Sequence, residues 1–173
     1  EKIMAKYNYE KKDNTYLTPP ALIRGGLSLL ALEKNQIKVD KFDLDVCCSN
    51  NNIPAKRHYK NGEFDGLAEP WAEYNWCNPP FDECKKWVIK AYNEAKLGKT
   101  TIMLIPARTE TAYFHDHILY NPNVEVVWLR KGHRFLDPET KQEMGVFKNA
   151  LAFVIFRGIK TGVVEETKEA LAV

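Results

Sequence analysis

Residues 73–106, EYNWCNPPFDECKKWVIKAYNEAKLGKTTIMLIP, predict the fold of this chain. The short strand expected at residues 73–77 is stopped by two prolines, which fix φ and donate no backbone hydrogen bond. Residues 84–98 follow, with apolar side chains along one helical face and a glycine at the end. Residues 100–105 form an apolar, β-branched run that is typical of a buried strand. A strand, a helix and a second strand in succession indicate an α/β protein with a largely parallel sheet.

Further elements are expected on both sides of this unit. Thr18-Pro19-Pro20 predicts a helix start, with Thr18 as the N-cap and proline in the first turn. The Gly25-Gly26 pair inside that helix indicates a close packing contact. Residues 48–72 have no clear periodicity and are expected to form a long connection. The remaining patterns predict strands at residues 42–47, 124–129 and 150–156, and a helix at residues 110–120.

The composition indicates one folded domain. The chain has 173 residues, of which 45% are apolar and 28% charged, a balance that excludes a disordered protein. A net charge of +2 argues against a protein that coats nucleic acid by charge alone. No apolar stretch approaches the ~18 residues of a membrane span, so no membrane partner is expected. We expect a polar arm at residues 1–15, the folded domain at 16–157 and a tail at 158–173.

The four cysteines are predicted to be structural. Cys47 and Cys48 are adjacent, and Cys77 and Cys84 are seven positions apart, so there is no Cys-x-x-Cys pair. This spacing is typical neither of a zinc site nor of a disulfide framework. Each cysteine lies in or beside an apolar run, which favours small buried thiols in a reducing cytoplasm and no metal site.

Unusual residues follow three of the predicted strands. These segments are Asp45-Val46-Cys47, Asn78-Pro79-Pro80-Phe81 and Pro106-Ala107-Arg108. Ligands of open α/β sheets bind beyond the C-terminal ends of the strands, so we expect the functional site at this edge.

The Asn78-Pro79-Pro80-Phe81 turn has two interpretations. The Asn78 side-chain oxygen and the Pro79 carbonyl are a rigid pair of acceptors for a planar amino group, whose ring would stack on Phe81. Alternatively, Asn-Pro-Pro is a stiff turn that ends a strand and has no further role. The four residues alone do not decide between the two.

Six stretches occur in a characteristic order along about residues 16–157: Thr18-Pro19-Pro20; residues 42–47; Asp65-Gly66-Leu67 with Trp71; residues 76–81; Pro106 to Thr111 through Phe114-His115; and residues 147–156. In this order they resemble the phage Dam-type DNA N6-adenine methyltransferase family. The Asn-Pro-Pro-Phe turn is similar to the catalytic Asp/Asn/Ser-Pro-Pro-Tyr/Phe signature of amino-methyltransferases that use S-adenosylmethionine. The resemblance implies methyl transfer to the N6 amine of a flipped-out adenine in double-stranded DNA, with GATC as the family-level target.

The resemblance also implies roles for the residues of the turn. Asn78 and Pro79 would accept hydrogen bonds from the N6 amine, Pro80 would keep the turn rigid, and Phe81 would stack on the base. No covalent intermediate is needed, so Cys77 and Cys84 are not candidate nucleophiles.

Cofactor residues follow from the same resemblance. Thr18 and Pro19 match the segment at the methionine end of S-adenosylmethionine, and Asp45 matches the acidic residue that ends the first strand. Cys47 begins the turn, which lacks the glycines of the wider superfamily. Asp65 would hydrogen-bond the cofactor ribose, although Asp-Gly is also an ordinary turn.

DNA contacts are expected from cations at the same edge of the sheet. Arg108 follows a buried strand, and its alternative role is a surface ion pair. Lys131, His133 and Arg134 form a basic cluster, which is otherwise a solvated loop.

The resemblance implies a pared-down Rossmann-like class I fold, mostly parallel with an antiparallel last strand. Asp45 and Asn78 are only 33 positions apart (78 − 45), so the second and third strands are expected to be short or missing. Two alternative functions stay open. One is a methyltransferase for protein glutamine or RNA guanine, and the other is a non-catalytic DNA-binding relic. We expect an enzyme of the cytoplasm, that of a bacterial host if the gene belongs to a phage, with no obligate protein partner.

Overall fold

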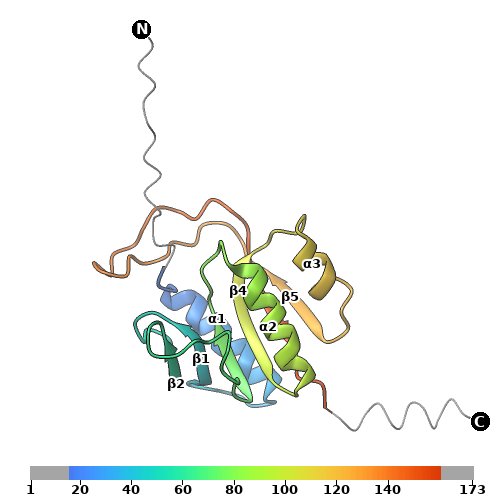
Figure 1. Ribbon diagram of the computed structural model, residues 1–173. Helices are drawn as coiled ribbons and strands as arrows, with labels where there is room; N and C mark the ends of the chain where they lie inside the picture. Colours follow the sequence, from blue (N-terminus) through green and yellow to red (C-terminus); the bar gives the residue numbers. More distant parts are fainter. Residues whose placement is uncertain (1–15, 161–173) are drawn as a thin grey trace, which may run out of the picture.

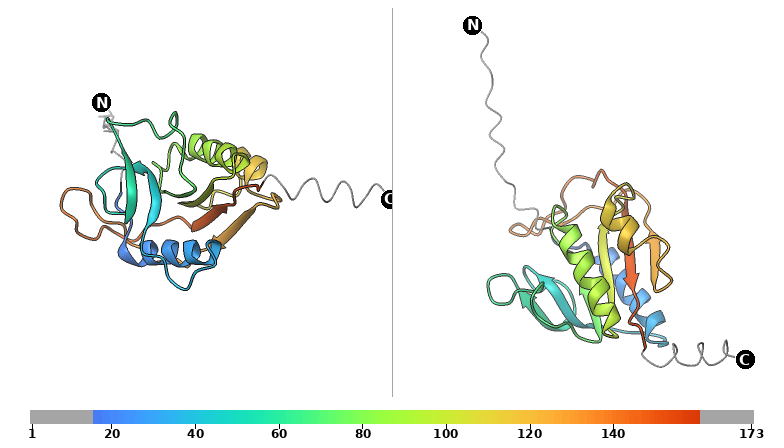
Figure 2. Two further views of the ribbon diagram at one scale, coloured as in Figure 1. Left: turned by 90° about the horizontal axis from the view of Figure 1, so that it is seen from below. Right: turned by 45° about the vertical axis from the view of Figure 1, so that its right-hand side comes forward.

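A six-stranded sheet in the order β2-β1-β3-β4-β6-β5 organises the protein. The computed structural model describes residues 16–160, so the arm predicted at residues 1–15 and most of the predicted tail lie outside the described residues. Helix α1 covers one face of the sheet, and α2 and α3 cover the other (Figures 1 and 2). The helices and strands are α1 (Pro20–Glu33), β1 (Phe42–Cys48), β2 (Ala55–Lys60), β3 (Tyr74–Cys77), α2 (Cys84–Lys96), β4 (Thr100–Pro106), α3 (Ala112–His117), β5 (Val124–Trp128) and β6 (Leu151–Phe156).

The sheet is parallel from β2 to β4 and antiparallel beyond it. Strands β2, β1, β3 and β4 pair in parallel, whereas β6 pairs antiparallel with both β4 and β5. These pairings confirm the predicted α/β class and its antiparallel last strand. Between β1 and β3 the chain forms one strand, β2, which agrees with the shortening predicted there.

The prediction that residues 48–72 are only a connection was wrong. Residues 55–60 of this stretch form β2 at the edge of the sheet, where β2 pairs with β1 alone. Of its six side chains only Tyr59 is buried, and Lys56 and Arg57 are exposed. An edge strand that is this polar carries no period-two apolar pattern, so hydrophobicity does not reveal it.

Bulky side chains fill the core around β4 and β6. Every residue of β6 is buried, as is every residue of β4 after Thr100, because both strands lie inside the sheet and helices cover its two faces (Figure 2). The predicted close contact at the glycine pair is confirmed. A Cβ atom on Gly26 would lie 2.5 Å from the Trp76 ring.

Helix α1 begins one residue later than the sequence predicted. Pro19, not Thr18, is its N-cap, and no side chain caps the helix. The Thr18 hydroxyl instead accepts a hydrogen bond from the side chain of Asn78. Within residues 16–160, no helix combines the length and the apolar character needed to span a bilayer.

Candidate active site

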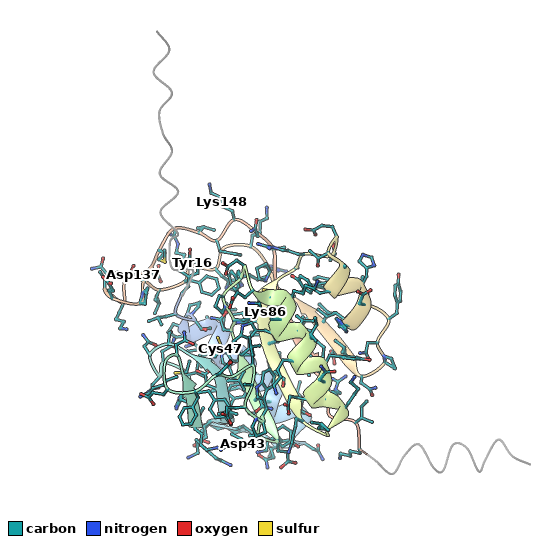
Figure 3. All side chains as sticks on the ribbon, in the orientation of Figure 1. Tyr16, Asp43, Cys47, Lys86, Asp137 and Lys148 are labelled. Atoms are coloured by element: carbon teal, nitrogen blue, oxygen red, sulfur yellow. The ribbon has the colours of Figure 1, made fainter. Side chains whose placement is uncertain are left out.

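A cavity opens where β1 and β3 end, beside the segment that precedes α1. It encloses about 470 Å³, its open mouth included. Figure 3 shows Cys47 at the cavity end of β1 and Asp43 at the other end of the strand. The lining residues are Tyr16, Thr18, Asp45, Cys47, Ser49, Asn52, Ile53, Asn61, Trp76, Asn78, Pro79, Pro80 and Phe81. The structure therefore brings together the Asn-Pro-Pro-Phe turn, the end of β1 and Thr18, as the sequence predicted.

The side-chain amide of Asn78 is held on one side only. Its Nδ2 donates to the Thr18 Oγ1 at 3.0 Å and to the Tyr16 carbonyl oxygen at 3.5 Å. Its Oδ1 is buried and has no hydrogen-bond partner in the described part of the chain. An unsatisfied buried acceptor costs about 1–3 kcal/mol, so such an atom in a cavity indicates a ligand that donates to it.

The two prolines fix the turn that carries Asn78. They lie between the last residue of β3 and the start of α2, and the Pro80 carbonyl accepts a hydrogen bond from the Glu83 N–H at 2.9 Å. No N–H within residues 16–160 donates to the Pro79 carbonyl. The Asn78 Oδ1 and the Pro79 carbonyl are thus two unengaged acceptors on adjacent residues.

Phe81 belongs to an aromatic cluster, which comprises Tyr16, Phe81, Phe135 and Phe147. The ring of Phe81 lies 5.3 Å from that of Phe147 and 5.7 Å from that of Phe135, both edge to face, and is only 7% exposed. The sequence did not predict Phe135 and Phe147 as site residues. The available signal was two phenylalanines within a mostly polar stretch.

These two phenylalanines come from a long segment between β5 and β6, residues 130–149, which we call the insert. The insert is joined to the segment before α1, because Leu17 and Leu136 exchange two backbone hydrogen bonds of 3.0 Å each. In Figure 3 Lys148 projects outward from the insert, on the side of the molecule where Tyr16 lies.

Asp45 is a buried carboxyl group at the edge of the cavity. It is 2% exposed, and burial raises its pKa from 3.8 to about 6, although the neighbouring His58 and a hydrogen bond from the Cys47 N–H oppose the rise. A carboxyl group with this pKa is mostly ionised at neutral pH and accepts hydrogen bonds from a ligand.

Replacing Asp45 by asparagine should stabilise the protein at alkaline pH. The native state holds the Asp45 proton more tightly than the unfolded state, so this group favours folding below pH ~4 and its contribution is lost as pH rises through about 6. The asparagine side chain would carry no charge to bury, and the gain of the variant over the parent at pH 8 should be about 2–3 kcal/mol. Urea unfolding at pH 5 and pH 8 measures it, with exposed Asp65→Asn as the matched control. An equal difference at both pH values would contradict the expectation.

In the turn after β1, an asparagine adopts the left-handed backbone conformation that glycine commonly supplies. Asn51 has φ +59°, the left-handed conformation that asparagine tolerates better than most residues. Its backbone N–H donates to the Cys48 Sγ, and the thiol donates back to the Asn51 Oδ1, each at 3.2 Å. The small side chains of Cys47 and Ser49 line the cavity beside this turn.

Two of the predicted cofactor residues lie outside the cavity lining. Asp65 is exposed, and its Oδ1 accepts a hydrogen bond from the Leu67 N–H at 2.9 Å, as in an ordinary Asp-Gly turn. Pro19 is buried as the N-cap of α1, and its carbonyl accepts from the N–H groups of Leu22 and Ile23. The structure therefore does not bring Asp65 or Pro19 to the cavity.

A set of potential metal ligands surrounds Asp45. One ligand atom each from Asp45, Cys48 and His58 lies within 4.8 Å of the others. Cys48 already exchanges two hydrogen bonds with Asn51, and the His58 Nε2 lies 2.9 Å from the Ile53 carbonyl oxygen. Because these groups have other partners, we assign no metal to them.

Burial raises the pKa of all four cysteine thiols, to about 11 for Cys48 and about 12 for Cys84. All four are free thiols; Cys48, Cys77 and Cys84 are buried as predicted, whereas Cys47 is only half-buried because it lines the cavity. Thiols in this state stay protonated at neutral pH and are poor nucleophiles.

The predicted basic residues lie at the same edge of the sheet as the cavity. Arg108 follows β4 and is exposed, and among residues 16–160 no ion pair engages it. Lys131 and Arg134 are exposed in the insert, and His133 is half-buried there. The Arg134 side chain donates to the Met144 carbonyl at 3.4 Å. The surface ion pair weighed for Arg108 is therefore absent from the described residues.

The fold and the cavity define an α/β protein whose candidate site lies at the carboxyl edge of its sheet and offers hydrogen-bond acceptors that have no partner among residues 16–160. A family model described as DNA N-6-adenine-methyltransferase (Dam) matches residues 11–169. The chain belongs to this family, and by family it is an adenine-specific DNA methyltransferase. The predicted resemblance is thereby confirmed.

Two phage proteins are similar to the chain. A DNA N-6-adenine-methyltransferase of Haemophilus phage HP1 is 29% identical over 119 residues, which is 67% of each chain. A DNA N-6-adenine-methyltransferase of Escherichia phage T1 is 26% identical over 144 residues, 73% of this chain and 59% of the relative. The chain thus spans about three fifths to two thirds of these relatives. No solved structure matches this chain significantly.

Proposed function

We propose that this protein transfers a methyl group from S-adenosylmethionine to the N6 amine of adenine in double-stranded DNA. The observation that carries the proposal is the buried Asn78 Oδ1 beside the Pro79 carbonyl, two acceptors to which nothing within residues 16–160 donates a hydrogen bond. Family membership supports adenine N6 as the acceptor. The sheet order supports a Rossmann-like class I fold, shortened between β1 and β3.

The two acceptors match the chemistry of an adenine amine. An N6 amino group has two N–H donors, which the Asn78 Oδ1 and the Pro79 carbonyl can accept. Those hydrogen bonds draw the nitrogen lone pair out of conjugation with the ring, which makes the nitrogen nucleophilic. Because the turn is rigid, the acceptors are in place before the base arrives, and this preorganisation lowers the barrier.

The residues at the end of β1 fit a cofactor that carries hydrogen-bond donors. Asp45 supplies a buried carboxylate at the cavity wall. Cys47 and Ser49 are small enough to leave room beside it. When bound, S-adenosylmethionine supplies an activated sulfonium methyl group. Asp45 would hold the cofactor in the ground and transition states alike.

The aromatic cluster determines how a flipped base reaches Asn78. Phe135 and Phe147 pack edge to face on Phe81, so its ring is not free to stack on a base. Stacking of adenine on Phe81 therefore requires these two side chains to move.

Lys131 is predicted to contact a DNA phosphate. Replacing it by alanine should weaken binding to all duplexes alike and flatten the log–log salt dependence by roughly one unit, since each phosphate contact contributes a slope of about −0.9. Fluorescence anisotropy over a salt series measures the slope. Lys38, exposed in the connection from α1 to β1 at the opposite edge of the sheet, is the matched control. Equal slopes for Lys131→Ala and the parent would place the insert off the DNA.

Incubating the protein with S-adenosylmethionine and duplex DNA tests the proposal. We expect N6-methyladenine in the DNA by nucleoside mass spectrometry, and sequencing of methylated plasmid then gives the recognition sequence, for which GATC is the first candidate. Methylation of RNA guanine or of protein glutamine instead would identify the alternative enzymes. Failure to bind S-adenosylmethionine by calorimetry would identify a non-catalytic relic. The phage origin of the two relatives supports action in the cytoplasm of a bacterial host.

A further inference from the structure

The Thr18 hydroxyl reaches across the fold to the side chain of Asn78. The two residues are 60 positions apart, yet the Asn78 Nδ2 donates to the Thr18 Oγ1 at 3.0 Å. Thr18 is 2% exposed, and its hydroxyl makes no cap for α1. The same Nδ2 faces a second acceptor, the Tyr16 carbonyl oxygen at 3.5 Å.

The Thr18 hydroxyl and the Tyr16 carbonyl together decide which end of the amide is left for a ligand: the hydroxyl anchors the amide, and the carbonyl, which can only accept, selects the Nδ2 end. An asparagine amide presents an acceptor or a donor depending on its rotation about χ2. With Nδ2 on the Thr18 hydroxyl, Oδ1 is the end that has no partner in the described part of the chain. The reverse orientation would turn Oδ1 toward the Tyr16 carbonyl and offer an N–H to the ligand, so the N–H groups of an amine would face another donor.

We propose that Thr18 is a positioning residue, which holds the Asn78 amide with its Oδ1 toward the substrate amine. This inference rests on the proposed function and assigns Thr18 a task different from contact with the methionine end of the cofactor. Thr18 acts through Asn78 and touches no reacting atom.

The neighbours of Thr18 keep its hydroxyl in place. Its carbonyl accepts a hydrogen bond from the Asn52 Nδ2 at 3.2 Å. Leu17 before it is joined to Leu136, and Pro19 after it is the N-cap of α1. Contacts of its backbone and of its two neighbours hold Thr18 in place. Its hydroxyl is therefore already positioned to bind the Asn78 amide before the substrate arrives.

Two substitutions separate positioning from packing. Thr18→Val keeps the shape of the side chain and removes the hydroxyl, and we expect kcat to fall about tenfold, the loss of one modest hydrogen bond in the transition state. Thr18→Ser removes a methyl group and keeps the hydroxyl, and it should be impaired much less. If Thr18 served packing alone, the serine variant would be the worse of the two.

Cofactor affinity separates positioning from cofactor contact. We expect calorimetry to give the same Kd for S-adenosylmethionine in the parent and in Thr18→Val, with the loss confined to kcat. A raised Kd with unchanged kcat would overturn the proposal and return Thr18 to the cofactor site. In an Asn78→Ala background, Thr18→Val should have no further effect on the rate.

Thr101→Val is the matched control for loss of a buried hydroxyl. Thr101 is 0% exposed in β4, and its Oγ1 has no partner among residues 16–160. Since Thr101 does not line the cavity, this variant should turn over at the parental rate. An equal loss in Thr101→Val would attribute the Thr18 effect to the core in general.

A measurement without turnover tests the contact itself. The Asn78 side-chain amide protons, assigned in a ¹⁵N spectrum by their loss in Asn78→Ala, should shift in Thr18→Val and stay near their parental positions in Thr18→Ser. Unshifted protons in Thr18→Val would overturn the proposal. If these protons respond as expected but the parent methylates no DNA, the proposed function fails and the positioning contact stands.

Discussion

Replacing Asn78 by alanine should slow methyl transfer to DNA by about 10²–10³ while leaving the fold and the affinity for S-adenosylmethionine nearly unchanged. The variant loses one of two acceptors that the turn holds ready for the amine, and it removes no packing from the core because Asn78 lies at the cavity wall. Initial rates with tritiated cofactor give the loss in kcat, and calorimetry gives the cofactor affinity.

An asparagine on the outer face of α2 is the control for this experiment. Asn93 is exposed, and alanine is a better helix former, so Asn93→Ala should turn over at the parental rate. A parental rate in Asn78→Ala would show that the Asn-Pro-Pro-Phe turn only ends a strand. In that case its second interpretation, a stiff turn without chemistry, would be correct.

Replacing Gly66 by alanine should cost about 3 kcal/mol of stability, the upper end of the usual cost of overpacking. An added Cβ would lie 2.0 Å from the Val46 carbonyl oxygen and 3.0 Å from the Trp87 ring. A backbone oxygen in the central strand β1 has no freedom to yield. Gly66 also accepts a hydrogen bond from the Trp71 Nε1 at 2.7 Å, which the displaced loop would lose.

Thermal unfolding measures this loss against a glycine in open space. A change of 3 kcal/mol corresponds to roughly 6–12 °C in Tm for a chain of this size. A Cβ on Gly145, in the insert, would meet nothing within 4 Å, so Gly145→Ala should leave Tm nearly unchanged. Equal Tm values for the two variants would contradict the close approach of residue 66 to β1.

The sequence predicted best those elements that have a clear apolar pattern. Strand β6 is buried throughout and β4 after Thr100, so an apolar run marks each of them, and α2 shows its buried face at helical spacing. Strand β2 was missed because it lies at the edge of the sheet with most of its side chains partly exposed. Strand β2 forms because it pairs with β1, and the local sequence of residues 55–60 does not reveal this pairing.

The sequence predicted the location of the candidate site and several of its lining residues, but not their contacts. The ends of β1 and β3 meet because parallel strands bring their carboxyl ends to one edge, a consequence of topology that the sequence does reveal. Thr18, by contrast, reads locally as a helix cap, and only its contact with Asn78 across 60 positions shows its other role. The resemblance implied that Asp65 contacts the cofactor, whereas the structure places Asp65 outside the cavity lining, with its Oδ1 accepting a hydrogen bond from the Leu67 N–H.

The pairing of Leu17 with Leu136 bears on how such an enzyme can diversify. The insert, which we propose contacts DNA, is hydrogen-bonded through Leu136 to Leu17. The next residue, Thr18, orients Asn78. A recognition loop attached in this way is not an exchangeable module. Grafting the insert of a relative to change the DNA sequence that is read would disturb the amide on which turnover depends, so specificity and catalytic rate must evolve together.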